Sequence, residues 1–243
     1  MMRKLIFTFL LGTISLFAQE KLVVEYKFNY NFDTSKITDK KTLDFYRINN
    51  NNVSYFQLVT TNEDSFFGRT EKIDNNQNNT EGGALMGGPA GNFYSNIKEK
   101  YSLFSIDLNG KKLIVKDSIK ALDWKLTKEK DKILGYEVKK AVYEKGKFSV
   151  EAWYAPKLAF KNGPNKYFGL PGMILRIIET VKSDKGDQQQ IYTAIDVKLD
   201  NTAKIDIPTK GKLITQKEFY EIIDDMNNKL IESSENRVIR RID

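Results

Sequence analysis

The sequence predicts a mainly β protein, in which a curved antiparallel sheet forms an open half-barrel and a C-terminal α-helix packs on it. Three observations lead to this prediction. Strict apolar and polar alternation marks the first strand, a strong hairpin signal stands near the middle of the chain, and a helical apolar stripe lies near its end. With 40% hydrophobic and 12% aromatic residues, the chain can bury a core of its own.

The first predicted strand contains Val24, Tyr26, Phe28, Tyr30 and Phe32, which alternate with polar residues. This period of two is typical of a strand with one buried face. Residues 43–48 and 53–60 then flank four consecutive asparagines at 49–52. Because asparagine tolerates the left-handed backbone of tight turns, we predict a hairpin here.

Residues 61–91 have a different composition, rich in asparagine and glycine and poor in apolar side chains. Such a segment has little surface to bury, so we expect a mobile loop, with Phe66 and Phe67 as its only anchor. Loops of this length are either functional or disordered, and the composition favours disorder.

Strand signals resume at residues 101–108 and 112–115, on either side of Asn109-Gly110, a strong signal for a two-residue hairpin turn. Further strands are predicted at residues 124–127, 135–143 and 148–154. The apolar run at 173–181 predicts a central strand buried on both faces, paired with residues 191–199 across the polar turn 182–187.

One helix is predicted at the end of the chain. Thr215 and Glu218 have the spacing of a capping box, which satisfies the free N–H groups of a first helical turn. An apolar face follows, made by Phe219, Ile222, Ile223, Met226 and Leu230. This face is expected to pack on the sheet, and docking of a partner is the alternative. Apart from the predicted loop 61–91, no repeat or change of composition divides the chain, so residues 19–243 are predicted to form one domain.

The N-terminus predicts export. Arg3 and Lys4 precede the apolar stretch 5–17, and Ala18 offers a small residue for cleavage, so residues 1–18 are interpreted as a signal peptide. A buried N-terminal helix is the alternative. The stretch is shorter than the roughly 20 residues needed to cross a bilayer, so no integral membrane span is expected. We expect a soluble protein in the periplasm, at the outer-membrane face or secreted.

The composition excludes several chemistries. The chain has neither histidine nor cysteine, which removes Ser-His-Asp and Cys-His catalysis, disulfides, and zinc sites of imidazole or thiolate. Carboxylate-only catalysis remains, but Asp123, Glu137 and Glu151 occur in turns or outward strand positions. We therefore predict no catalytic residues, no cofactor and no metal. The net charge of +7 is dispersed along the chain, and no motif indicates nucleic-acid binding.

The most informative stretch runs from residue 133 to residue 179. It contains Gly135-Tyr136, Lys140-Ala141, Ala152-Trp153-Tyr154-Ala155-Pro156, Gly163-Pro164 and Gly169-Leu170-Pro171-Gly172-Met173-Ile174. Pro171 has a fixed φ and Gly172 accepts a positive one, so Leu170–Met173 suits a type II turn. We expect Trp153 to lie across Gly169 and Gly172, since glycine lets a large ring approach closely.

This block resembles the GLPGLI family of exported bacterial proteins, with high specificity over about fifty residues and weaker similarity over most of the remaining chain. Met173 stands where the family has leucine, Val138 where many members have cysteine, and residues 157–160 lack the usual Ile-Pro. The family has no established activity, so the resemblance implies a compartment but no catalytic residues.

Two interpretations of the block remain open: a turn that specifies the fold, and a binding lip formed by Trp153, Tyr154, Pro164, Gly169, Leu170, Pro171 and Gly172. The predicted sheet is similar in outline to periplasmic lipoprotein carriers and can hold an apolar ligand on its concave face. Three functions follow: non-enzymatic binding of an apolar ligand or peptide, an adaptor between envelope proteins, and a carboxylate-only enzyme. The first is preferred because aromatic alternation is present and catalytic groups are missing.

Overall fold

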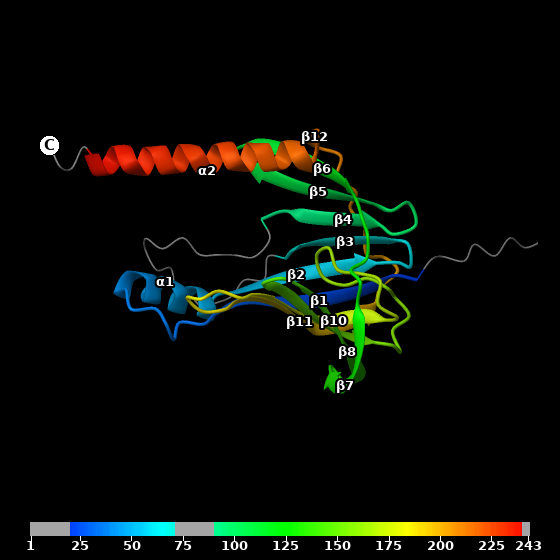
Figure 1. Cartoon of the computed structure of the whole chain (residues 1–243). Coiled ribbons are helices and arrows are strands. Elements are labelled where there is room, and N and C mark those ends of the chain that lie inside the picture. The colour runs from blue at the N-terminus through cyan, green and yellow to red at the C-terminus, as the bar shows by residue number, and fades with distance from the viewer. Residues whose placement is uncertain (1–19, 71–89, 240–243) are drawn as a thin grey trace, which may run out of the picture.

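The computed structural model describes residues 20–70 and 90–239. The predicted signal peptide and residues 71–89 of the predicted loop lie outside this part of the chain. Figure 1 shows the described residues as one curved, open sheet, with a helix near each of its two arms.

The described residues form twelve strands and two helices. In chain order they are β1 (Leu22–Phe32), α1 (Lys40–Asn51), β2 (Val53–Thr60), β3 (Asp64–Arg69), β4 (Asn92–Asn96), β5 (Tyr101–Leu108), β6 (Lys111–Ser118), β7 (Lys125–Ile133), β8 (Tyr136–Lys145), β9 (Phe148–Ala155), β10 (Met173–Val181), β11 (Gln188–Leu199), β12 (Lys212–Thr215) and α2 (Gln216–Ile239).

One sheet contains all twelve strands, in the order β12-β6-β5-β4-β3-β2-β1-β11-β10-β9-β8-β7. Every neighbouring pair is antiparallel except β12 and β6, which run parallel. Strands β12 and β7 lie at opposite ends and do not pair with each other, so the sheet stays open. The predicted fold class, an open curved antiparallel sheet with a C-terminal helix, is confirmed.

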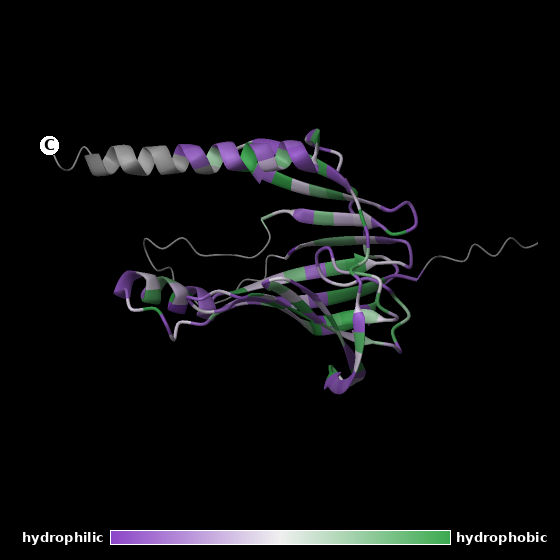
Figure 2. Ribbon diagram, in the orientation of Figure 1, coloured by the Kyte–Doolittle hydropathy of each residue, from purple (hydrophilic) through white to green (hydrophobic). Residues whose placement is uncertain are grey.

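Aromatic side chains build the centre of the core. Tyr26 and Phe28 of β1, Phe56 of β2, Phe67 of β3 and Tyr192 of β11 are all buried. Their registers place them on one face of the sheet, where the Phe56 and Phe67 rings stack at 5.1 Å and the Phe28 and Tyr192 rings lie 4.8 Å apart. Figure 2 shows hydrophobic residues concentrated along these central strands. The alternation predicted for residues 24–32 therefore marks the inner face of the sheet.

The hairpin predicted across the four asparagines is wrong, because residues 43–48 belong to helix α1. Asp39 caps this helix by accepting a hydrogen bond of 2.8 Å from the Thr42 N–H, and the Asn49 side chain donates to the Phe45 carbonyl one turn earlier. The Tyr46 ring stacks on Phe32 at 4.6 Å. Capping and this tertiary contact override the strand preference of the aromatic residues.

The loop prediction for residues 61–91 is wrong at residues 64–69, which form β3 between β2 and β4. Phe67 is 1% exposed and fills the core beside Phe56, so it does more than anchor a loop. Phe66 and Phe67 supply the apolar surface that the rest of residues 61–91 lacks, and this allows residues 64–69 to form a strand.

Helix α2 begins with the predicted capping box. The Glu218 carboxylate accepts hydrogen bonds from the Thr215 N–H and hydroxyl, at 2.7 and 2.8 Å, and the Glu218 N–H donates back to the hydroxyl at 3.2 Å. The ring centres of Phe219 and Phe104 of β5 lie 5.9 Å apart, and Ile222 packs against the same small hydrophobic cluster. The packing of the helix start on the sheet is confirmed, and Figure 1 shows the helix continuing past the sheet. Neither described helix is long and apolar enough to cross a membrane.

Candidate functional site

The signature segment between β9 and β10 folds back over the sheet as an ordered loop. Asn162 is 1% exposed, and its amide donates hydrogen bonds to the Thr60 hydroxyl at 2.6 Å and the Thr61 carbonyl at 3.3 Å. A Cβ on Gly163 would lie 2.8 Å from the Ile174 side chain, so glycine is required at this close contact. The loop is thus tied to the end of β2 and packed on β10.

The predicted type II turn at Leu170–Met173 is wrong. The Gly172 N–H donates to the Leu170 carbonyl at 2.8 Å, which is the three-residue pattern of a γ-turn around Pro171. The Met173 N–H instead donates to the Leu158 carbonyl at 3.0 Å. Pairing with the incoming arm of the loop takes the bond that a type II turn would have used.

A tryptophan does contact this loop, but it is Trp124 rather than Trp153. The Trp124 indole N–H donates to the Phe168 carbonyl at 3.1 Å. The atoms that approach Gly169 and Gly172 most closely belong to Ala121 and to the Ala155 backbone. The expectation that Trp153 lies across these glycines is therefore wrong, because small groups fill that space.

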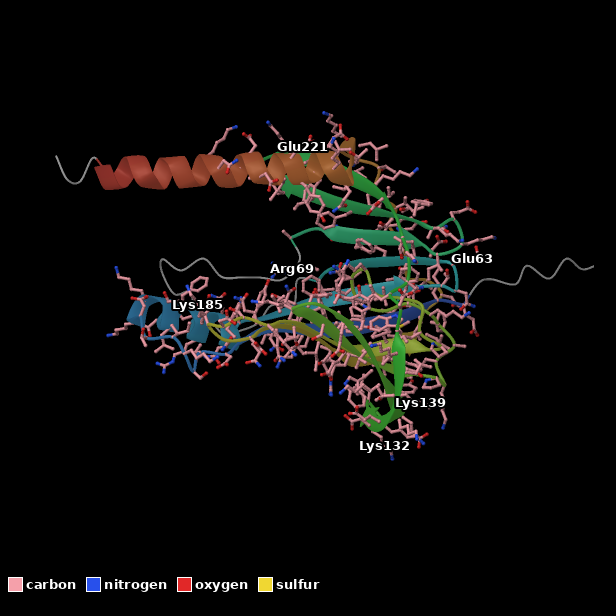
Figure 3. The ribbon with its side chains drawn as sticks, viewed as in Figure 1. Glu63, Arg69, Lys132, Lys139, Lys185 and Glu221 are labelled. Atoms are coloured by element: carbon pink, nitrogen blue, oxygen red, sulfur yellow. The ribbon has the colours of Figure 1, made fainter. Side chains whose placement is uncertain are left out.

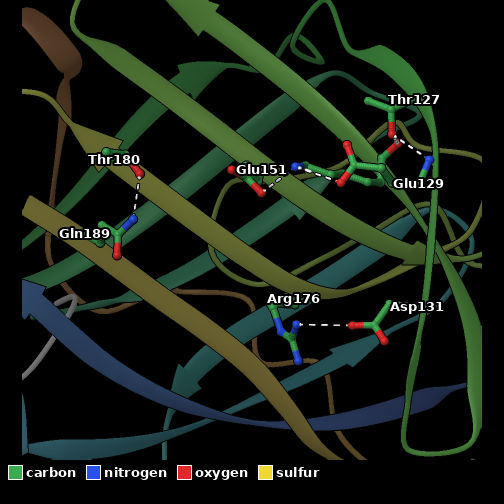
Figure 4. A network of polar contacts seen from close by, with 8 residues as sticks. Thr127, Glu129, Asp131, Glu151, Arg176, Thr180 and Gln189 are labelled. Carbon is green, nitrogen blue, oxygen red and sulfur yellow. Dashed lines mark hydrogen bonds and ion pairs between the residues drawn. The ribbon is translucent and has the colours of Figure 1, made fainter.

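The remaining signature residues pair across β8 and β9. Ala141 lies opposite Ala152 in the core, and Lys140 lies opposite Trp153, with its ammonium 5.8 Å from the indole ring. Lys140 also forms ion pairs with Glu151 at 3.0 Å and Glu129 at 3.3 Å (Figure 4). Desolvation lowers the pKa of Lys140, but the two carboxylates outweigh it and raise the pKa overall.

A second ion pair joins Arg176 of β10 to Asp131 of β7 at 3.7 Å. Pairs at this level of exposure contribute little stability, about 0–1 kcal/mol each. Other charged residues are spread around the periphery: Lys132 and Lys139 lie at the β7–β8 end, and Glu221 lies on the outside of α2 (Figure 3).

The seven residues predicted to form a binding lip differ in exposure. Tyr154, Pro164, Leu170 and Gly172 are buried, Trp153 is half-buried, and Gly169 and Pro171 are exposed. The loop brings Pro164 and Gly169–Gly172 into one segment beside β9, and none of the seven lines the cavity described next. Their binding role stays a prediction.

The feature best suited to hold a ligand is an open cavity of about 620 Å³, here called the concave-face cavity. It lies between the inner face of the sheet, the middle of the signature loop and the start of α2. Its apolar walls include Tyr30, Phe93, Phe104, Val115, Leu122, Phe168 and Phe219. A volume of this size is typical of small-molecule sites. A second hollow, of about 690 Å³, lies beside β6 and includes Ala90, where the described chain resumes.

One end of the cavity is polar. Glu179 of β10 and Gln190 of β11 are opposite each other in the sheet register, and both line the cavity with Tyr167 of the loop. The Tyr167 and Tyr192 hydroxyls are buried and have no partner in hydrogen-bonding geometry. The Tyr167 hydroxyl lies near the Glu179 carboxyl without completing a bond to it. Buried polar groups without partners are rare and require an explanation.

Electrostatics distinguish this end from the rest of the sheet. Burial raises the pKa of Glu179, and nearby Lys166 and Tyr167 only partly offset this. Burial also raises the pKa values of Tyr30, Tyr167 and Tyr192, and the charge of Glu179 raises each of them further. A single carboxyl group thus lies among three tyrosines. No group of three carboxylates among the described residues is placed to hold a metal ion.

Replacing Glu179 by glutamine is expected to stabilise the protein above neutral pH. The pKa of Glu179 in the folded protein is raised above its ordinary value of 4.5, so the folded state binds more protons than the unfolded state between the two values. Stability therefore falls as pH rises through the folded pKa. At pH 8 we expect Glu179→Gln to raise the free energy of unfolding by about 1 kcal/mol, measured by urea denaturation.

The same substitution should make the difference in free energy of unfolding between pH 5 and pH 8 smaller than it is in wild type. Glu137→Gln, at an exposed position of β8, is the matched control and should leave that difference unchanged. A Glu179→Gln protein that is less stable than wild type at pH 8 would show that the carboxylate makes favourable contacts inside the cavity.

Sequence reasoning missed this site. Glu179 is the only acidic residue in the apolar run 173–181. A carboxylate in a strand that is otherwise mostly apolar was the one sequence feature that could have indicated the site. Tyr30 was recognised as an inward residue of the first strand, but its neighbours in the cavity come from distant segments.

Comparison with known proteins finds one family model, described as "Protein of unknown function (Porph_ging)", which matches residues 144–176. The match covers β9, the signature loop and the first part of β10. Among curated proteins, none matches the chain. The matched residues include 165–168, which line the concave-face cavity.

Two solved structures share the fold. They are crystal forms of PNGF-II, in space groups P21 and C2, with TM-scores of 0.55, sequence identities of 17% and 18%, and coverage of 84% of this chain. The chain spans about a third of the length of PNGF-II, at 33% and 32%. An outer membrane lipoprotein-sorting protein domain from Vibrio parahaemolyticus aligns at 7% identity over 77% of this chain and 88% of its own. The TM-score of 0.29 is too low to indicate a shared fold.

Proposed function

We propose that the chain is an exported, non-enzymatic binding protein that holds an apolar ligand, or an apolar part of a peptide, in the concave-face cavity. The observation that carries the proposal is the cavity itself, about 620 Å³ with aromatic walls on the inner face of an open sheet. Export is inferred from the N-terminal sequence and from the resemblance to the GLPGLI family.

The shape of the sheet supports this proposal. An open sheet exposes its inner face unless other segments cover it, and here the signature loop and the start of α2 cover it only in part. The side chains of Phe93, Phe104 and Phe168 are each left partly exposed around the cavity. Burial of their remaining apolar surface by a ligand releases about 25 cal/mol per Å².

The test compares two Leu→Asp variants. Leu122 is half-buried and lines the cavity, whereas Leu126 of β7 is 60% exposed and lies outside it. The fluorescent probe N-phenyl-1-naphthylamine should bind wild type and Leu126→Asp equally, and should bind Leu122→Asp at least ten-fold more weakly. Circular dichroism of both variants checks that they are folded.

Failure of wild type to bind any apolar probe would contradict the proposal. Equal binding by the two variants would place the probe elsewhere and would also contradict it. In either case the adaptor function becomes the preferred hypothesis, and crosslinking in intact cells would then identify a protein partner.

A further inference from the structure

The polar end of the concave-face cavity contains more unsatisfied hydrogen-bonding capacity than an apolar ligand can use. Glu179 forms no ion pair with the described residues, and the buried Tyr167 and Tyr192 hydroxyls lie near Glu179 and Asn165 without reaching hydrogen-bonding geometry. Tyr167 is 2% exposed and lines the cavity, so its hydroxyl is the buried polar group best placed to meet a ligand.

The chemistry of this end favours a cation with several N–H groups. A carboxylate accepts hydrogen bonds and requires positive charge, and a tyrosine hydroxyl oxygen accepts as well as donates. A primary ammonium has three donors, which suffice for Glu179, Tyr167 and one further acceptor. Aromatic rings around the carboxyl, here those of Tyr30 and Tyr167, also stabilise a cation through their electron-rich faces.

We propose that the concave-face cavity selects amphiphiles that carry a primary ammonium group, with the apolar body against the aromatic walls and the ammonium at Glu179 and Tyr167. This rests on the proposed function and specifies its ligand class. A carboxylate ligand would instead meet Glu179 as a like charge, and a neutral alcohol would leave the half-buried carboxylate without an ion-pair partner.

Lys166 is the competitor that the ligand must replace. Its side chain is exposed, and its ammonium lies 5.8 Å from the centre of the Tyr167 ring. It forms no ion pair with Glu179, although its charge lowers the pKa of that carboxyl and partly offsets the effect of burial. Lys120 and Asp117 also line the cavity, both in exposed positions that put opposite charges at its entrance.

The experiment measures displacement of N-phenyl-1-naphthylamine from the full mature chain by decylammonium, 1-decanol and decanoate, which share one apolar tail. We expect decylammonium to displace the probe at a concentration at least ten-fold lower than either of the others. In Glu179→Gln the preference should fall below three-fold, because decylammonium binding weakens more than decanol binding does. Glu137→Gln, at an exposed position of β8 outside the cavity, is the control for loss of a carboxylate and should keep the preference.

Lys166→Gln provides a second, independent readout. Removing the competing cation should strengthen decylammonium binding two- to five-fold. Decylammonium binding that stays unchanged or weakens would contradict the competition by Lys166.

Decanoate binding as tightly as decylammonium, or a preference that persists in Glu179→Gln, would overturn the ammonium assignment and leave apolar binding intact. Absence of displacement by all three amphiphiles, with the probe itself unbound, would refute the proposed function as well.

Discussion

Gly172→Ala should reduce the free energy of unfolding by about 4 kcal/mol, a large loss against the roughly 5–15 kcal/mol that stabilises a typical domain. Gly172 has a φ of +150°, where a residue with a Cβ is strained by about 1–3 kcal/mol. A Cβ at this position would also lie 2.3 Å from the Ala155 carbonyl oxygen, and a backbone atom cannot easily move away. The loss should appear as a lower midpoint in urea and a lower yield of folded protein.

Gly146→Ala is the matched control for this change. Gly146 also has a positive φ, +61°, but a Cβ there would meet no atom within 4 Å. Backbone strain alone should cost about 1–2 kcal/mol. If the two substitutions had equal effects, the close contact between Gly172 and Ala155 would not be what the signature glycine provides.

Leu170→Ala is the second large effect, an expected loss of about 2–5 kcal/mol. The Leu170 side chain is 1% exposed and belongs to the main core, where its removal leaves a cavity between the loop and the sheet. Thermal denaturation of the purified variant measures the loss.

Pro171→Ala at the next residue provides the comparison, because Pro171 is exposed and should change stability by less than about 1 kcal/mol. A Leu170→Ala protein as stable as wild type, with altered probe binding, would instead favour the interpretation of the signature as a binding lip.

Much of the fold could be predicted from local sequence. The inward residues of β1, the Asn109-Gly110 hairpin, the β10–β11 pair and the Thr215–Glu218 capping box each depend on neighbours within a few residues. The predictions that were wrong concern segments with competing local signals. Residues 43–48 have aromatic residues typical of strands, but the Asp39 cap and the contact of Tyr46 with Phe32 make them helical.

The candidate site could not be predicted in the same way, because it is assembled from segments far apart in the chain. Glu179, Tyr30 and Phe93 come from three strands, and Tyr167 comes from a loop. Sequence alone drew attention to Trp153 for its size. The contact at the loop is instead made by Trp124, whose hydrogen bond to the Phe168 carbonyl spans 44 residues of chain. Local patterns specify strands and caps, whereas a cavity depends on which strands become neighbours.

Native mass spectrometry of the protein, purified gently from its own cells, tests the binding function most directly. We predict an added mass of a few hundred daltons in wild type and in Leu126→Asp, and loss of that mass in Leu122→Asp. A bare polypeptide mass for wild type, or an added mass that Leu122→Asp retains, would contradict binding in the concave-face cavity.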